Sequence, residues 1–221
     1  YADAFHNLAI ALGKNQQHDQ ALLAVRKAIK SGGETAEFLN TLGKIYLKMG
    51  DIENAMGPLE KAMELKPNNI ETLIVIGNSY RMLEKYEMAQ KQYLTVLKID
   101  KHCVPAIYNL GLTHQELGDY KNAEYYYNAA LMIKPQDATI LRSISRIAKV
   151  RSSKDPLILK IDNLIKTEKS HASLAELLYA KFKLNDDLKL YKTAYSALVK
   201  AGRFQQKSIS YEVEKDLKQF N

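Results

Sequence analysis

The chain has 221 residues, of which 46% are hydrophobic and 26% charged, and its formal net charge is +7. No apolar run approaches the roughly 20 residues that a membrane-spanning helix needs, so the sequence excludes an integral membrane protein built from such helices. The single cysteine, Cys103, cannot form a disulfide within the chain, which favours a reducing, cytoplasmic location.

Residues 1–137 repeat with a fixed period. Abundant Ala, Leu, Lys, Glu and Gln, without strand-like alternation, predict an all-α chain. Four sets of positions recur at one constant interval: Ala21, Ala55, Ala89 and Ala123; Leu8, Leu42, Ile76 and Leu110; Ala9, Gly43, Gly77 and Gly111; and Ala28, Ala62, Val96 and Ala130. This interval predicts four helical hairpins over residues 2–35, 36–69, 70–103 and 104–137.

The second unit explains why these residue types recur. Two antiparallel helices approach closely only where side chains are small, which Gly43 and Ala55 provide. Gly50 can adopt the positive φ that ends a helix, and Asp51 can cap the next one. Pro67 then stops the second helix. One such hairpin cannot bury both faces alone, so stacking of the four units is expected.

These residues resemble the tetratricopeptide repeat. The likeness is carried in the second unit by Leu42, Gly43, Tyr46, Gly50, Ala55, Leu59, Ala62 and Pro67. The third and fourth units match almost as well, and the first is the weakest, with Gln16 where the turn glycine is usual. The resemblance implies a right-handed superhelix, an α-solenoid, whose concave groove is lined by the first helix of each hairpin.

After Asp137 the periodicity fades. Residues 138–168 are predicted to form capping and connecting helices, the second of which begins at Asp155 and Pro156. Residues 169–221 are predicted to form a degenerate hairpin and a terminal helix leading to a downstream domain. Asn185, Asp186 and Asp187 are expected at the turn of that hairpin, and Ser210 is expected to cap the final helix.

The region around residues 172–220 is similar to the segment that joins the repeats to the catalytic domain in bacterial repeat-containing sulfotransferases. The corresponding residues are Tyr191, Ala194, Tyr195, Gly202, Arg203, Lys207, Tyr211 and Glu212. This resemblance implies a non-catalytic arm that presents an acceptor protein. No glycine-rich, phosphate-binding loop occurs in the chain, so a sulfotransferase domain would lie beyond Asn221.

The sequence predicts no catalytic residues, no metal site and no cofactor. The five histidines show no helical i, i+4 pairing and no CxxC partner. The aromatic run of Tyr125, Tyr126 and Tyr127 suggests either packing between repeats or stacking on nucleic-acid bases, and packing is favoured because Tyr127 falls on a core position.

A polar and cationic wall is predicted along the groove. The outward positions of the first helices are Lys44, Lys48, Asn78, Arg81, Tyr108, Asn109, Gln115, Arg142 and Arg146. Amide side chains can hydrogen-bond an extended peptide backbone, and arginine can hold a carboxylate. The expected partner is a protein or peptide, acidic or bound by its C-terminus, and a merely hydrated face is the alternative.

Three functions are compatible with the sequence. The first is a protein-interaction scaffold, and the second is the sulfotransferase arm, a more specific version of it. The third is binding of nucleic acid or an anionic surface, because residues 142–221 carry 17 Lys and Arg against 9 Asp and Glu. The scaffold is favoured, since helical Lys and Arg are usually solvated.

Overall fold

The secondary structure is all helical over the part of the chain that the structure describes, as predicted. The computed structural model describes the backbone of residues 1–219 and the side chains of residues 1–208. Its helices are α1 (Ala2–Lys14), α2 (His18–Gly32), α3 (Ala36–Lys48), α4 (Ile52–Leu65), α5 (Ile70–Met82), α6 (Tyr86–Ile99), α7 (Val104–Glu116), α8 (Tyr120–Ile133), α9 (Ala138–Ile147), α10 (Pro156–Thr167), α11 (His171–Asp187) and α12 (Tyr191–Gln219). The starts of α1, α3, α5, α7 and α9 are evenly spaced along the chain, at the period of the sequence repeat.

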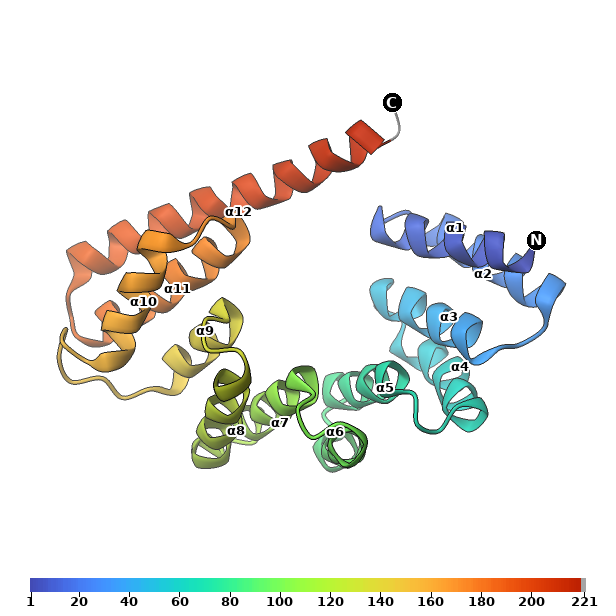
Figure 1. The fold of residues 1–221 in the computed structure, drawn as a ribbon, viewed down its shortest axis with the longest axis horizontal. Helices are drawn as coiled ribbons and strands as arrows, with labels where there is room; N and C mark the ends of the chain where they lie inside the picture. The colour runs from blue at the N-terminus through green and yellow to red at the C-terminus, as the bar shows by residue number, and fades with distance from the viewer. Residues whose placement is uncertain (220–221) are drawn as a thin grey trace. The chain divides into compact units, whose positions relative to one another are not determined.

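The chain divides into two compact units, Tyr1–Thr113 and His114–Asn221, and the division falls within α7. In unit 1 the helices pack as hairpins, α1 with α2, α3 with α4 and α5 with α6. Each hairpin also contacts the next, through α2 with α3 and α4 with α5 (Figure 1). Contacts between α1 and α3, and between α3 and α5, bring the first helices of successive hairpins together.

Glycines lie where the two helices of a hairpin approach most closely. A Cβ atom added to Gly43 would lie 2.7 Å from Leu59 Cδ2 and 3.2 Å from the carbonyl oxygen of Ala55. A Cβ atom on Gly77 would lie 2.5 Å from the ring of Tyr93. The separations from Leu59 and Tyr93 are far below van der Waals contact, so these positions require glycine. The seams of small residues expected from the sequence are therefore confirmed in unit 1.

The turns inside the hairpins share one backbone conformation but not one residue type. Gly50 and Gly118 have φ values of 80° and 76°, and Gln16 and Glu84 adopt φ values of 60° and 58° at the same place in their repeats. Asp51 caps α4 as expected, because its side chain accepts a hydrogen bond from the Asn54 backbone N–H.

Replacing Glu84 by glycine is expected to stabilise the chain. A left-handed conformation costs an L-residue about 1–2 kcal/mol, and glycine removes this cost. The greater conformational entropy of glycine in the unfolded chain offsets part of the resulting stabilisation. The free energy of unfolding, measured by urea denaturation, should rise by about 0.5–1 kcal/mol. The reciprocal change at the matching turn, Gly50→Ala, should lower it, and a Glu84→Gly variant no more stable than wild type would contradict this account.

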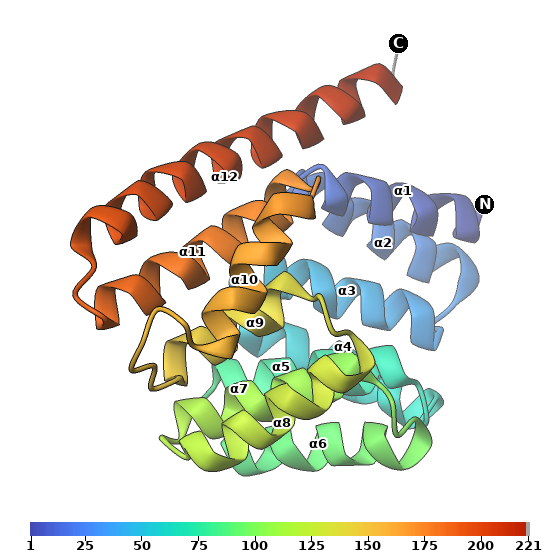
Figure 2. The same cartoon turned by 60° about the vertical axis from the view of Figure 1, so that its left-hand side comes forward.

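Unit 2 is organised around α11, which packs against α9, α10 and α12 (Figure 2). Helix α9 also packs on α8, so it follows the preceding hairpin as the sequence predicts. The hydrophobic core of unit 2 contains Leu141 of α9, Ile158 and Ile161 of α10, and Leu177 and Leu184 of α11. Helix α10 begins as expected, with Asp155 accepting a hydrogen bond from the Leu157 backbone N–H and Pro156 in the first turn.

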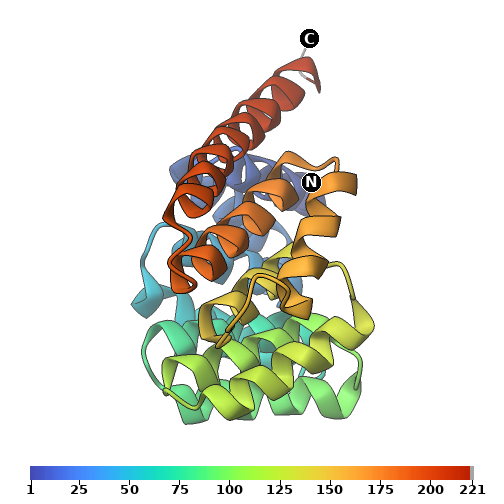
Figure 3. The same ribbon diagram turned by 90° about the vertical axis from the view of Figure 1, so that its left-hand side faces the viewer.

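Two expectations for the C-terminal region are wrong. Asn185, Asp186 and Asp187 are the last residues of α11 and not a turn. The chain reverses just after them, where Lys189 takes a φ of 61°. Ser210 does not begin a helix, because α12 runs without interruption from Tyr191 to Gln219 (Figure 3). No residue in this stretch of α12 is a proline, so nothing in its backbone chemistry ends the helix at Ser210.

Candidate functional site

An open cavity of about 690 Å³ lies on the first helices of unit 1. Helices α1 and α3 form its walls, and Asn69 and Glu71 at the start of α5 close one side. One wall is fixed by a hydrogen bond of 2.8 Å between His6 Nε2 and Thr41 Oγ1, which joins α1 to α3. The cavity is therefore a feature of the packed hairpins and not of a loop.

A buried amide lines this cavity. The Asn40 side chain on α3 is only 6% exposed, and its Oδ1 atom has no hydrogen-bond partner among the described residues. The Nδ1 atom of His18, which also lines the cavity, is buried and unpartnered in the same sense. A buried polar atom without a partner costs free energy, so the Oδ1 atom of Asn40 does not stabilise the fold.

The charges around the cavity are partly paired. Lys44 Nζ lies 2.6 Å from Glu71 Oε1. Glu37 is paired with Lys66, whose hydrogen bond holds the pKa of Glu37 below its usual value and keeps this carboxylate ionised. Within the described part of the chain, the ammonium groups of Lys14 and Lys48 form no ion pair. Both lie in the last turns of their helices, so this end of the cavity is cationic.

The predicted wall residues of unit 1 have different surroundings. Lys44 and Lys48 line the cavity, while the others do not. Asn78 on α5 accepts a hydrogen bond of 2.7 Å from the Tyr93 hydroxyl, so its amide also supports the α5–α6 hairpin. Arg81 is half-buried near the end of α5. Tyr108 is half-buried on α7, and Asn109 is 9% exposed.

In unit 2 the predicted residues mostly serve the fold. Gln115 accepts a hydrogen bond of 2.8 Å from the hydroxyl of Tyr127, which is fully buried as the packing interpretation expects. The Arg142 guanidinium donates to Glu176 at 2.9 Å and lies 4.5 Å from the ring centre of Tyr179, so it connects α9 to α11. Arg146 is exposed. The ligand-binding role of all these residues stays a prediction.

His6 and Asn40 were not predicted as site residues, although the sequence held a signal for both. They occupy the same place in their repeats as Tyr108, because whole periods of the repeat separate the three positions. Tyr108 was predicted as a wall residue, and the equivalent positions one, two and three periods earlier are Ile74, Asn40 and His6.

The described part of the chain offers neither a membrane span nor a metal cluster. Over residues 1–219, no helix combines the length and the apolar character that crossing a bilayer requires. Among the side chains of residues 1–208, no three from His, Cys, Asp or Glu gather as metal ligands would.

Family models match two segments of the chain. Residues 104–137 match the tetratricopeptide repeat, and residues 14–96 match subunit 3 of the anaphase-promoting complex, or cyclosome. Neither match reaches residues 172–220, on which the sulfotransferase resemblance depends.

Curated relatives match over part of their own length. Superkiller complex protein 3 of Mus musculus is 30% identical over 105 residues, which are 48% of this chain and 7% of that protein. A TPR repeat-containing protein of Methanocaldococcus jannaschii is 32% identical over 130 residues, or 58% of this chain and 23% of that protein. The chain thus spans less than a quarter of either relative.

Solved structures show the same fold. Pseudomonas aeruginosa pilF is 18% identical and superposes with a TM-score of 0.73 over 97% of this chain and 96% of that one. Identity at this level supports the fold alone. Together with the even spacing of the helix starts and the glycine seams, these matches show that the chain has the fold of stacked tetratricopeptide-repeat hairpins.

Proposed function

We propose that the chain is a protein-interaction scaffold and that the cavity of α1 and α3 holds a segment of its partner. The buried, unpartnered Oδ1 atom of Asn40 carries the proposal, because a peptide N–H would satisfy it. Repeat solenoids of this type use extended surfaces built from successive hairpins for binding. The name of one relative, Superkiller complex protein 3, and that of one matching family, subunit 3 of the anaphase-promoting complex, also refer to protein assemblies.

The charges favour an acidic side chain or a C-terminal carboxylate in the partner segment. Lys14 and Lys48 stand at the cationic end of the cavity, while Lys44 is paired with Glu71. The amide of Asn40 would hold the peptide backbone, and the two lysines would hold the carboxylate. The buried amide and the pattern of charge thus favour a peptide segment with a negative end.

Replacing Asn40 by leucine is expected to have opposite effects on stability and binding. Leucine has a similar size and leaves no buried amide, so the free energy of unfolding should rise by about 1 kcal/mol. The same change removes the backbone contact, so peptide affinity should fall by about tenfold or more. Thermal unfolding measures the first effect. Fluorescence anisotropy measures the second, with a library of short peptides that carry free or amidated C-termini.

Matched variants test the charge component of this proposal. Lys14→Gln with Lys48→Gln should weaken binding of peptides with a free C-terminus, while Lys91→Gln with Lys98→Gln removes the same charge from the exposed side of α6. Equal peptide affinity in both double variants would show that Lys14 and Lys48 do not contribute to binding. Unchanged affinity of Asn40→Leu would show that the cavity is not the peptide-binding site.

Finer proposals rest on the sequence alone. The sulfotransferase arm depends on the resemblance of residues 172–220, and an assay for sulfonate transfer by the full gene product tests it. The cytoplasmic location depends on the single cysteine and is tested by fractionation. For nucleic-acid binding, the affinity must fall steeply with salt, because phosphate contacts release counterions.

A further inference from the structure

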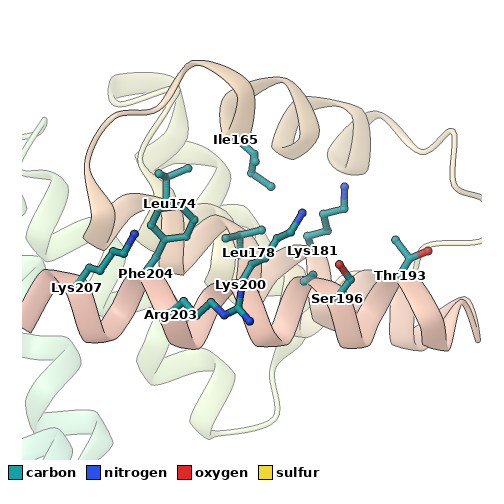
Figure 4. Close-up of a pocket in the computed structure, with 11 residues that line it drawn as sticks. Ile165, Leu174, Leu178, Lys181, Thr193, Ser196, Lys200, Arg203, Phe204 and Lys207 are labelled. Atoms are coloured by element: carbon teal, nitrogen blue, oxygen red, sulfur yellow. The ribbon is translucent and has the colours of Figure 1, made fainter.

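A second groove, of about 630 Å³, lies in unit 2 between α10, α11 and α12. Its floor is apolar (Figure 4). Leu174 and Leu178 of α11 and Ala197 of α12 are nearly buried there, while Ile165 of α10 and Phe204 of α12 are only partly covered. An apolar side chain entering the groove would contact Ile165 and Phe204 and remove both from water.

The rim of this groove is cationic. Lys181, Lys200, Arg203 and Lys207 line it, and among the described residues no acidic side chain does. The last three lie at spacings of three and four residues along α12, so they share one face of that helix. Figure 4 shows their side chains along the groove. The charge of Lys181 is balanced by Asp162 at 2.6 Å.

Two of the cations have no internal role. In the part of the chain that the structure describes, Lys200 and Arg203 form neither an ion pair nor a hydrogen bond, and both are exposed. Lys207 by contrast lies 5.8 Å from the ring centre of Phe204. Like charges gathered on one helix face repel each other slightly, so this arrangement does not stabilise the fold by itself.

We propose that this groove binds an acidic amphipathic helix of a partner protein. Such a helix presents aliphatic side chains along one stripe and carboxylates beside it, which matches an apolar floor with a cationic rim. The lining residues Thr193 to Lys207 extend for roughly 20 Å along α12, which accommodates a helix of about 14 residues. Carboxylates flanking the stripe pair with Lys200 and Arg203.

A nucleic acid fits this groove less well. Its phosphates would satisfy the cations, but a phosphate backbone would not cover the exposed apolar surface of Ile165 and Phe204. An acidic helix satisfies both parts of the surface.

The groove is separate from the cavity of unit 1, because its lining residues all belong to unit 2. Variants in the groove therefore leave Asn40, Lys14 and Lys48 intact. Either site can fail its test without affecting the other.

The test uses the full chain and a fluorescein-labelled designed peptide of about 16 residues, with leucines on one helical face and glutamates elsewhere. A scrambled peptide of the same composition keeps the charge but not the apolar stripe. The variant Lys200→Gln with Arg203→Gln is compared with Lys160→Gln with Lys192→Gln. The latter removes two exposed charges from α10 and α12 outside the groove. Circular dichroism establishes that both variants are folded.

The designed peptide is expected to bind the wild type and the control variant equally, and the groove variant about tenfold more weakly. The scrambled peptide should bind weakly to all three. No binding of the designed peptide, equal binding of the scrambled one, or an unaffected groove variant would each overturn the proposal. It would also be overturned if single-stranded RNA bound more tightly than the designed peptide and lost that affinity in the groove variant.

Discussion

Replacing Gly77 by alanine is expected to lower the free energy of unfolding by about 1–3 kcal/mol. The new methyl group would lie 2.5 Å from the ring of Tyr93, which is fully buried. The ring cannot move aside easily, because its hydroxyl donates to Asn78 at 2.7 Å. Relief would require the α5–α6 hairpin to open, which loosens the packing at its centre.

The control for this prediction is Gly13→Ala in the same unit. An added Cβ at Gly13 meets no atom within 4 Å, so only helix propensity acts there. Its stability should stay equal to wild type or rise by at most about 1 kcal/mol. Chemical denaturation followed by circular dichroism compares the two variants. Equal stability of both would mean that the seam does not need glycine.

Truncating Leu59 to alanine is expected to cost about 2–5 kcal/mol, the largest effect among these predictions. Leu59 is fully buried on α4 and faces Gly43 across the hairpin. The loss combines the transfer of the side chain to water with the cavity left behind. The midpoint of urea unfolding should fall without a change in slope if unit 1 keeps its compactness.

Combining this change with Gly43→Ala tests the contact directly. Alone, Gly43→Ala clashes with Leu59 Cγ; in the double variant the added methyl group enters the space that Leu59 has vacated. The double variant should therefore be more stable than the sum of the single effects predicts, with a coupling energy of about 1–3 kcal/mol. Strict additivity would show that these two residues are not in contact in solution.

The fold of residues 1–137 was predictable because it depends on local, repeated chemistry. Gly43, Gly50 and Asp51 each meet one structural requirement, and the same requirement recurs at the equivalent position of each hairpin. In the C-terminal region the prediction failed where acidic residues were taken for a turn. Asp186 and Asp187 favour turns in isolation, but Leu184 beside them is fully buried in the core of unit 2, and α11 continues through both residues and ends at Asp187.

The site was less predictable than the fold. Helix geometry identified outward positions such as Lys44 and Lys48, but it could not show which of these side chains would pair with an acidic residue of the chain itself. The sequence predicts that Arg142 binds a ligand carboxylate, but in the structure its guanidinium contacts Glu176 and Tyr179 of α11. The groove along α12 depends on three helices that share no repeat pattern, so only their packing reveals it.

The position of α11 at the centre of unit 2 has a consequence for shortening the chain. Removal of α1 and α2 would take away one hairpin and uncover α3, leaving the pairs α3–α4 and α5–α6 with their own partners. A chain ending before α11 would deprive both α9 and α10 of the helix on which they pack. We therefore expect trimming from the N-terminus to be gradual in its effect, whereas a stop codon before residue 171 should collapse the C-terminal unit in one step.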